Sequence, residues 1–182
     1  MSFLYFAYGS NMLAARLSHR CPSASVIGPA NALGHKLAFE KASSDGSGKA
    51  MLAADSDGAL RVPGVLFEIS LADRPALDEA EGVGFGYERT DSFAVATDQD
   101  GETVEATTYL ATAVDPRLKP YDWYLALVIA GAHQHDLGAE HVRALRRTEY
   151  VIDDQPTRKA RAIALQALQS SGHPDYHLLL CG

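Results

Sequence analysis

The chain has 182 residues, of which 47% are hydrophobic and 21% charged, the composition of an ordinary globular protein. Its formal net charge is -7 and no basic cluster stands out, so the electrostatic signature of a nucleic-acid-binding protein is missing. The length fits one domain over residues 1–182, long enough to bury a substantial core.

The cysteines and the N-terminal segment indicate the compartment. Cys21 and Cys181 stand near opposite ends of the chain, which is no disulfide framework and favours a reducing environment. The first residues carry no cationic segment typical of a signal peptide, and the longest apolar run, around 125–132, is too short to span a bilayer. We therefore expect a cytoplasmic protein with no membrane partner.

The chain opens with a short apolar and aromatic run, Phe3 to Tyr8, that predicts a buried strand. Gly9 and Ser10 break this run. Asn11 is a good N-cap, so the pattern predicts that it starts a helix from Met12 to Arg20.

The next part of the chain, from about residue 30 to 69, is typical of strands. Short apolar runs occur at 37–39, 50–54 and 62–69, and a glycine-rich loop occupies 43–48. The pair Pro63-Gly64 predicts an edge position or a bulge near the start of the last run.

A helix from Leu71 to about Ala80 is predicted next, with Ser70 as its cap and Gly82 as its left-handed end. Residues 87–97 and 103–110 then predict two strands of a hairpin, joined by a turn at 98–101.

After Pro116 the pattern changes from strands to helices. Helical stretches are expected at 121–134, 140–149 and 157–169, separated by glycine, aspartate and proline. Because strands come first and helices last, the order favours an α+β fold over a doubly wound sheet.

Two segments are candidates for chemistry. The turn from Tyr8 to Asn11 ends a strand and starts a helix, so its backbone N–H groups are suited to hold a carboxylate or an oxyanion. A plain strand-to-helix turn explains the same pattern. The second segment carries Asp78, Glu79 and Glu81 at a helix end, where like charges disfavour ionisation and suit one carboxyl to acid/base work. A solvated acidic helix end is the alternative.

Four segments together carry a family resemblance. They are Phe3 to Met12 (FLYFAYGSNM), Val62 to Phe67 (VPGVLF), Leu77 to Val83 (LDEAEGV), and Tyr124 with the apolar helix that ends at Ala132. In this order they resemble the gamma-glutamylcyclotransferases, and the match covers about residues 3–145. The stretch from Tyr150 onward adds nothing to it.

The resemblance implies a small mixed β-barrel with surrounding helices and a site at the barrel's mouth. It implies that Glu81 is the catalytic acid/base that cyclises a small gamma-glutamyl substrate to 5-oxoproline, with neither a metal nor an organic cofactor. The substrate-binding residues that it implies are Tyr5, Phe6, Ala7, Tyr8, Gly9, Ser10, Asn11, Tyr87 and Tyr124.

Several alternatives stay open or are disfavoured. A related cyclotransferase acting on gamma-glutamylamines or another acyl compound stays open, as does a non-enzymatic module that binds carboxylates. Zinc spacing, a complete phosphate-binding loop at 46–49 and a serine-hydrolase elbow at Ser10 are not present. The sequence does not determine the leaving group, the role of the loop at 43–48 or the oligomeric state. A homodimer is one of the open possibilities.

Overall fold

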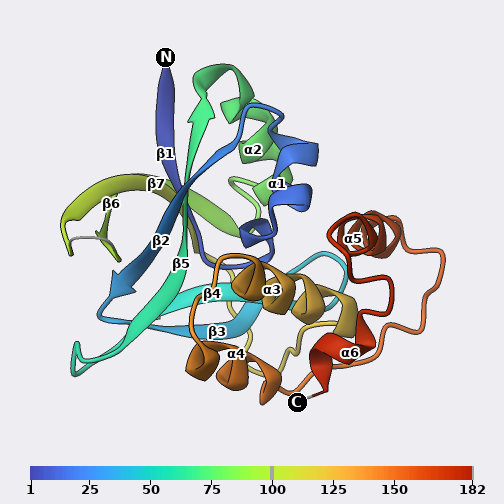
Figure 1. Ribbon diagram of the computed structural model, residues 1–182. Coiled ribbons are helices and arrows are strands. Elements are labelled where there is room, and N and C mark those ends of the chain that lie inside the picture. The colour runs from blue at the N-terminus through green and yellow to red at the C-terminus, as the bar shows by residue number, and fades with distance from the viewer. Residues whose placement is uncertain (99–100, 182) are drawn as a thin grey trace.

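The computed structural model describes residues 1–98 and 101–181. Five of its strands form a closed barrel in the order β1-β5-β2-β6-β7 (Figure 1). These strands are β1 (Ser2–Ala7), β2 (Ser25–Leu33), β5 (Arg61–Ser70), β6 (Tyr87–Thr97) and β7 (Thr103–Ala111).

The barrel is mixed because one of its seams is parallel. Tyr5 on β1 pairs with Thr107 on β7 in parallel, whereas the other neighbouring strands pair antiparallel. The parallel seam closes the sheet and leaves no free edge. The expected α+β fold with a small mixed β-barrel is therefore confirmed.

The start of β5 explains how a proline fits into a barrel strand. Pro63 pairs with Asn31 of β2, but β1 ends its pairing at Ala7 opposite Val65. At Pro63 the strand therefore has a β-strand neighbour on one side, and the missing N–H is tolerated there. The predicted edge is local; the bulge in this pairing lies instead in β2, between Val26 and Gly28.

A second, two-stranded sheet lies beside the barrel. It consists of β3 (His35–Ala42) and β4 (Gly48–Ala54), joined by the glycine-rich loop. Gly48 is packed so closely against the carbonyl of Phe39 that a side chain would collide with the backbone. Only glycine fits at this close approach. Ala50, two residues further along β4, contacts Tyr87 and Tyr124.

The helices form two groups, α1 with α2 beside the barrel and α3 to α6 next to the second sheet (Figure 1). Near the N-terminal half lie the short 3₁₀ turns η1 (Ser10–Met12) and η2 (Leu71–Asp73), with the helices α1 (Ala14–Arg20) and α2 (Arg74–Glu81) side by side. The other helices are α3 (Asp122–Gln134), α4 (Ala139–Arg146), α5 (Lys159–Ser170) and α6 (His177–Leu180). The sequence did not predict α6.

The predicted cap at Asn11 is wrong. The helix α1 starts at Ala14 after Leu13, and no side chain caps it. Asn11 lies inside the preceding 3₁₀ turn, and its side chain is buried and bonded to other residues. The Asn11 side chain forms tertiary hydrogen bonds in place of a helix cap.

The predictions around the second helix are confirmed. Ser70 accepts a hydrogen bond from the N–H of Ala72, and Gly82 ends α2 with φ 68°. The predicted hairpin is present as β6 and β7. Its turn includes residues 99 and 100, which lie outside the described residues.

The helix α3 is the central core helix, with every residue from Asp122 to Ala132 buried. Gly131 brings this helix so close to η1 that a Cβ atom there would lie 2.7 Å from the backbone nitrogen of Leu13. The run 125–132 is thus apolar because it is surrounded by protein. None of the helices in the described part of the chain is long and apolar enough to cross a membrane. Cys21 and Cys181 are free thiols.

Candidate active site

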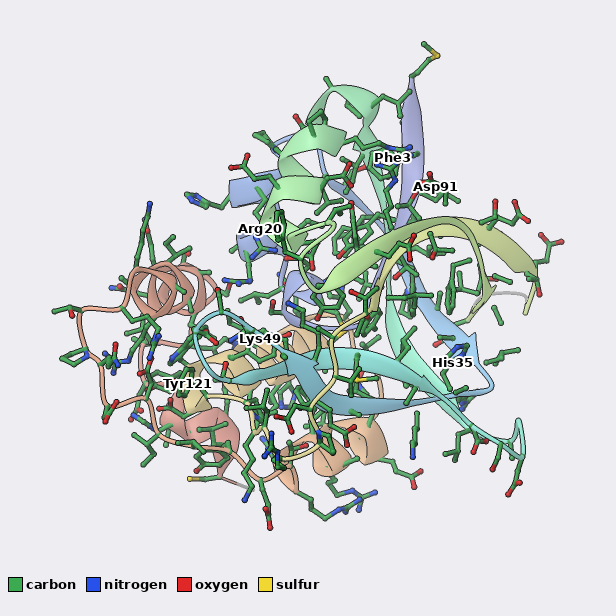
Figure 2. The ribbon with its side chains drawn as sticks, turned by 180° about the vertical axis from the view of Figure 1, so that it is seen from behind. Phe3, Arg20, His35, Lys49, Asp91 and Tyr121 are labelled. Carbon is green, nitrogen blue, oxygen red and sulfur yellow. The ribbon has the colours of Figure 1, made fainter. Side chains whose placement is uncertain are left out.

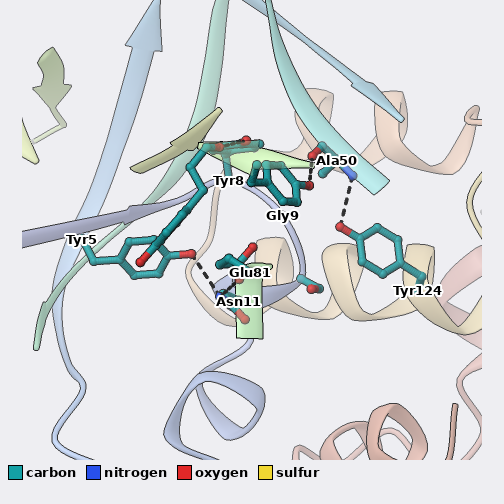
Figure 3. Close-up of a pocket in the computed structure, with 10 residues that line it drawn as sticks. Tyr5, Tyr8, Gly9, Asn11, Ala50, Glu81 and Tyr124 are labelled. Carbon is teal, nitrogen blue, oxygen red and sulfur yellow. Dashed lines mark hydrogen bonds between the residues drawn. The ribbon is translucent and has the colours of Figure 1, made fainter. Parts of the chain in front are cut away.

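A pocket opens where β1 ends and runs into η1 (Figure 3). Five tyrosines give it a mainly aromatic wall. The residues that line it are Tyr5, Tyr8, Gly9, Ser10, Asn11, Ala50, Glu81, Tyr87, Tyr109 and Tyr124. They come from β1, η1, β4, α2, β6, β7 and α3, so seven elements meet here.

Glu81 is the only carboxylate among these lining residues. It is the last residue of α2, directly before the left-handed Gly82, and its side chain is 15% exposed. Its Oε1 atom accepts two hydrogen bonds, from Asn11 Nδ2 at 2.7 Å and from Arg20 Nη1 at 2.9 Å. In residues 1–98 and 101–181, no group donates a hydrogen bond to Oε2.

Asn11 and Arg20 form a closed set of contacts around this carboxylate. Arg20 Nη1 donates to Asn11 Oδ1 at 2.9 Å as well as to Glu81. Asn11 Nδ2 also donates to the hydroxyl of Tyr5 at 3.0 Å. Each partner is held by another, so the position of Glu81 is fixed from two sides.

The acidic cluster at the end of α2 does not crowd as the sequence suggested. Asp78 turns away from Glu81 and pairs with Arg89 on β6 at 2.5 Å, and it accepts a hydrogen bond from Tyr109 at 2.8 Å. Glu79 is exposed. Successive residues on a helix point in different directions, so the three carboxylates find three different environments.

The pocket tyrosines are neutral at physiological pH. Burial is the main cause that raises the pKa of Tyr5, Tyr8 and Tyr87, and the nearby carboxylate of Glu81 raises it further. Burial likewise raises the pKa of Tyr124. Each hydroxyl therefore keeps its proton and is able to donate a hydrogen bond.

Two of these tyrosines hold the backbone of one residue of β4, Ala50, in place. Tyr87 donates its hydroxyl proton to the carbonyl of Ala50 at 2.5 Å, and the hydroxyl of Tyr124 accepts from the N–H of Ala50 at 3.1 Å (Figure 3). Tyr124 thereby keeps its own proton for another acceptor. The separate two-stranded sheet is tied to the pocket through this residue.

The turn after β1 presents its backbone toward the same space. Its first hydrogen bond runs from Met12 N to Gly9 O at 3.0 Å, so the preceding N–H groups are those that a helical start leaves without intrahelical partners. A Cβ atom on Gly9 would lie 3.0 Å from Ala50 Cβ and 3.4 Å from the Tyr124 hydroxyl. Glycine thus keeps this side of the pocket open.

The structure brings together most of the residues that the resemblance implied. Tyr5, Tyr8, Gly9, Ser10, Asn11, Glu81, Tyr87 and Tyr124 all line the pocket. Phe6 and Ala7 do not line it. The ring of Phe6 stacks on Phe93, and Ala7 pairs with Val65 in the barrel.

Three residues of the site were not predicted from the sequence. Tyr109 lines the pocket from β7, where a threonine-rich strand gave no sign of its role. Ala50 contributes mainly its backbone, which no side-chain pattern reveals. Arg20 is the last residue of the helix predicted from Met12, and its position there indicated no role at the site. In the described part of the chain, no three His, Cys, Asp or Glu side chains come together in a group able to hold a metal ion.

The sequence matches a known protein family and several known proteins. A model of the AIG2-like family matches residues 61–145. Gamma-glutamylcyclotransferase of Homo sapiens is 34% identical over 152 residues, which cover 81% of this chain and 79% of that protein. Its counterpart from Bos taurus is 32% identical over the same shares of both chains.

Solved structures show the same fold. One named gamma-glutamyl cyclotransferase superposes with a TM-score of 0.80 at 29% identity, covering 91% of this chain and 99% of that one. An uncharacterised protein from Homo sapiens superposes with a TM-score of 0.79 at 30% identity, covering 91% and 98%. The likeness therefore extends to the full length of these neighbours.

Proposed function

The chain belongs to the gamma-glutamylcyclotransferase family, and we propose that it converts a small gamma-glutamyl compound to 5-oxoproline and a free amine with Glu81 as acid/base. The observation that carries the proposal is the state of this carboxylate. One oxygen is fixed by Asn11 and Arg20, the other has no hydrogen-bond donor in the described residues, and the residue lines the pocket.

The reaction needs a base close to the substrate's α-ammonium group. An ammonium cannot attack a carbonyl until it has lost a proton, and a carboxylate within hydrogen-bond distance accepts that proton. Glu81 is well suited, because its free oxygen can move a proton while the other oxygen keeps the side chain in place. Such positioned acid/base groups contribute roughly 10²–10⁴-fold to rate.

The freed amine then attacks the γ-carbonyl carbon of the same molecule. A C–N bond forms and closes a five-membered ring, and the C–N bond to the leaving amine breaks. Glu81 gives its proton to the departing nitrogen. The ring nitrogen then loses its extra proton, which the released amine takes up as it becomes an ammonium ion. Because nucleophile and carbonyl belong to one molecule, orientation supplies much of the acceleration and no protein nucleophile is needed.

The turn after β1 is the second part of the proposal. The N–H groups of Gly9, Ser10 and Asn11 are suited to hold a substrate carboxylate or the oxygen that becomes negative during attack. Glycine at position 9 lets the ligand approach the backbone closely. The neutral hydroxyls of Tyr5 and Tyr124 supply further donors in the same pocket.

The experiment measures 5-oxoproline release by the wild-type protein and by Glu81→Gln. Gamma-glutamyl-alanine, gamma-glutamyl-ε-lysine and glutathione are the substrates, so the leaving group is an amino acid, a side-chain amine or a dipeptide. Glu79→Gln is the matched control, because Glu79 lies two residues earlier on α2 and is exposed. We expect Glu81→Gln to lose activity by about a hundredfold or more, with Glu79→Gln near wild type.

The outcomes separate the alternatives. Equal rates in wild-type protein and Glu81→Gln would remove Glu81 from the catalytic role. Folded wild-type protein that binds these compounds but releases no 5-oxoproline would favour a carboxylate-binding module. Release from gamma-glutamyl-ε-lysine alone would identify a cyclotransferase for gamma-glutamylamines.

A further inference from the structure

A second cavity adjoins the pocket on the side of Glu81. It shares Ser10, Glu81, Tyr87 and Tyr124 with the first cavity. Its other walls carry four cationic side chains, Arg16, Arg20, Lys41 and Lys49, which we call the cationic annex. Two of them come from α1, one from β3 and one from β4.

Two of these four cations already have carboxylate partners. Arg20 pairs with Glu81 at 2.9 Å. Lys49 pairs with Asp45 at 2.8 Å and lies over the rings of Trp123 and Tyr124, near Tyr121 (Figure 2). These two charges are therefore compensated within the protein.

The other two cations form no ion pair among the described residues, although, against the lowering by burial, the nearby Glu81 carboxylate acts to raise the pKa of both Arg16 and Lys41. Arg16 is 9% exposed and donates from Nε to the Ser10 hydroxyl at 3.0 Å. Lys41 is 8% exposed, and its Nζ atom lies 4.5 Å from the centre of the Tyr87 ring without a hydrogen-bond acceptor in the described residues. Nearly buried lysine and arginine side chains are rare unless they form ion pairs, and Glu81 and Asp45 together supply two negative charges for the four cations of the annex. The remaining positive charge beside a cavity points to an anionic ligand.

The chain makes room for Lys41 at a specific glycine. A Cβ atom on Gly86 would lie 2.7 Å from Lys41 Cε and 2.8 Å from its Nζ. Gly86 belongs to the loop that follows Glu81, so the ammonium group is packed directly against the segment that carries the proposed acid/base. The position of this charge is therefore set by the fold and is not that of a free surface lysine.

The annex lies where a leaving group is expected. Under the proposed function, Glu81 returns a proton to the departing nitrogen, so that nitrogen is next to Glu81. The turn at Gly9 to Asn11 takes the gamma-glutamyl carboxylate in the first cavity. What extends past Glu81 into the second cavity is then the departing amino acid.

We propose that the cationic annex binds the carboxylates of the leaving group, and that the enzyme prefers gamma-glutamyl compounds whose leaving group is a dicarboxylic amino acid. The two cations without an ion-pair partner, Arg16 and Lys41, match the α-carboxylate and the side-chain carboxylate of such a residue. Lys41 is the residue that selects the acidic side chain. This inference rests on the proposed function.

The test compares gamma-glutamyl-glutamate with gamma-glutamyl-glutamine, which have nearly the same shape and differ by one negative charge. We expect wild-type kcat/KM to favour the glutamate compound by about tenfold, the value of one partly desolvated charge contact. Raising the ionic strength from roughly 0.05 to 0.5 M should reduce this ratio, because salt screens the contact. A ratio near one, or in favour of the glutamine compound, would overturn the proposal.

Two variants test whether Lys41 causes the preference for the glutamate compound. Lys41→Met keeps the length of the side chain without its charge, and we expect the ratio to fall toward one. Lys36→Met is the matched control, since Lys36 lies on the same strand β3 but is exposed and does not border the annex. Retention of the full preference in folded Lys41→Met would remove Lys41 from this role.

The same compounds distinguish this proposal from the proposed function. If folded wild-type protein turns over neither these two compounds nor any of the three substrates named above, the proposed function fails, and calorimetric dissociation constants for the pair decide the annex separately. About tenfold tighter binding of the glutamate compound would still support the annex. Equal binding would overturn it as well.

Discussion

Asn11 Nδ2 donates a hydrogen bond to Glu81 Oε1 at 2.7 Å and thereby joins the turn after β1 to the end of α2. The two residues are separated by 70 positions in the sequence, and Asn11 is 3% exposed. The same amide contacts Tyr5 and Arg20. One buried side chain thus fixes the carboxylate relative to the backbone groups proposed to hold the substrate.

Asn11→Ala removes this link. We expect kcat/KM for 5-oxoproline formation to fall by about 10–100-fold, because Glu81 loses one of the two groups that position it. The free energy of unfolding should fall by about 1–3 kcal/mol, since the partners of a buried amide are left unsatisfied. Steady-state kinetics and urea unfolding measure the two effects.

Asn31→Ala is the control for this variant. Asn31 is also buried, and its amide bonds Asp98 at another part of the barrel, away from the pocket. We expect a similar loss of stability with unaltered kinetics. If both variants lost activity equally, the effect of Asn11 would be one of stability and not of positioning.

Tyr124→Phe tests the tie between α3 and β4. The variant leaves the N–H of Ala50 without its hydroxyl partner in a buried setting, which costs about 1–3 kcal/mol. Activity should also fall, because Tyr124 and Ala50 both line the pocket. Chemical unfolding and 5-oxoproline release are the measurements.

Tyr121→Phe provides the comparison. Its hydroxyl donates to the carbonyl of Asp45 and accepts from Arg158, but it does not line the pocket. Removal of this hydroxyl should affect stability and leave 5-oxoproline release near wild type. Full activity and stability in Tyr124→Phe would show that water replaces the lost oxygen at Ala50.

The sequence predicts the elements of this fold better than its contacts. Ser70 and Gly82 mark both ends of a helical segment because capping depends on residues close in the chain. Asn11 has the same local signal and does not cap, because burial beside Tyr5 and Glu81 outweighs a cap that solvent can replace. Local patterns do not reveal whether capping or burial determines the position of such a side chain.

The residues of the site are also predicted where they belong to one continuous segment and missed where they come from separate elements. The motifs around residues 3–12 and 77–83 identify Glu81 and the turn, since each is a continuous segment. Three further groups belong to separate elements that only the tertiary fold brings together: Arg20 on α1, Tyr109 on β7 and the backbone of Ala50 on β4. Short-range spacing carries no information on such meetings. The cationic annex is hidden for the same reason.

Acid sensitivity should arise partly at Asp153, which anchors the segment after Tyr150 to α3. Burial acts to raise the pKa of this carboxyl, but hydrogen bonds from Arg158 and Trp123 outweigh it and lower the pKa to about 2. A lowered folded-state pKa means that the stabilisation is present above the unfolded pKa near 3.8 and is lost as pH falls through about 2.

Asp153→Asn should therefore reduce the free energy of unfolding at pH 7 by about 1–2 kcal/mol, with the difference shrinking between about pH 4 and pH 2. Fluorescence of Trp123, the one tryptophan in the sequence, follows urea unfolding at each pH. Asp154→Asn is the control, because its side chain is exposed. A difference that stays constant with pH would assign the effect to packing alone.

Gly131→Ala tests how closely α3 must approach the turn. Alanine inside a helix ordinarily stabilises it by about 0.5–1 kcal/mol relative to glycine. Here the added Cβ would lie 2.7 Å from both Leu13 N and Met12 Cβ, and backbone does not yield as a flexible side chain does. We expect a net loss of about 1–3 kcal/mol, as in overpacked cores. Activity should fall too, because relief of the clash moves the segment that contains Ser10 and Asn11. A more stable variant with full activity would mean that α3 shifts away from the turn while the turn keeps its place.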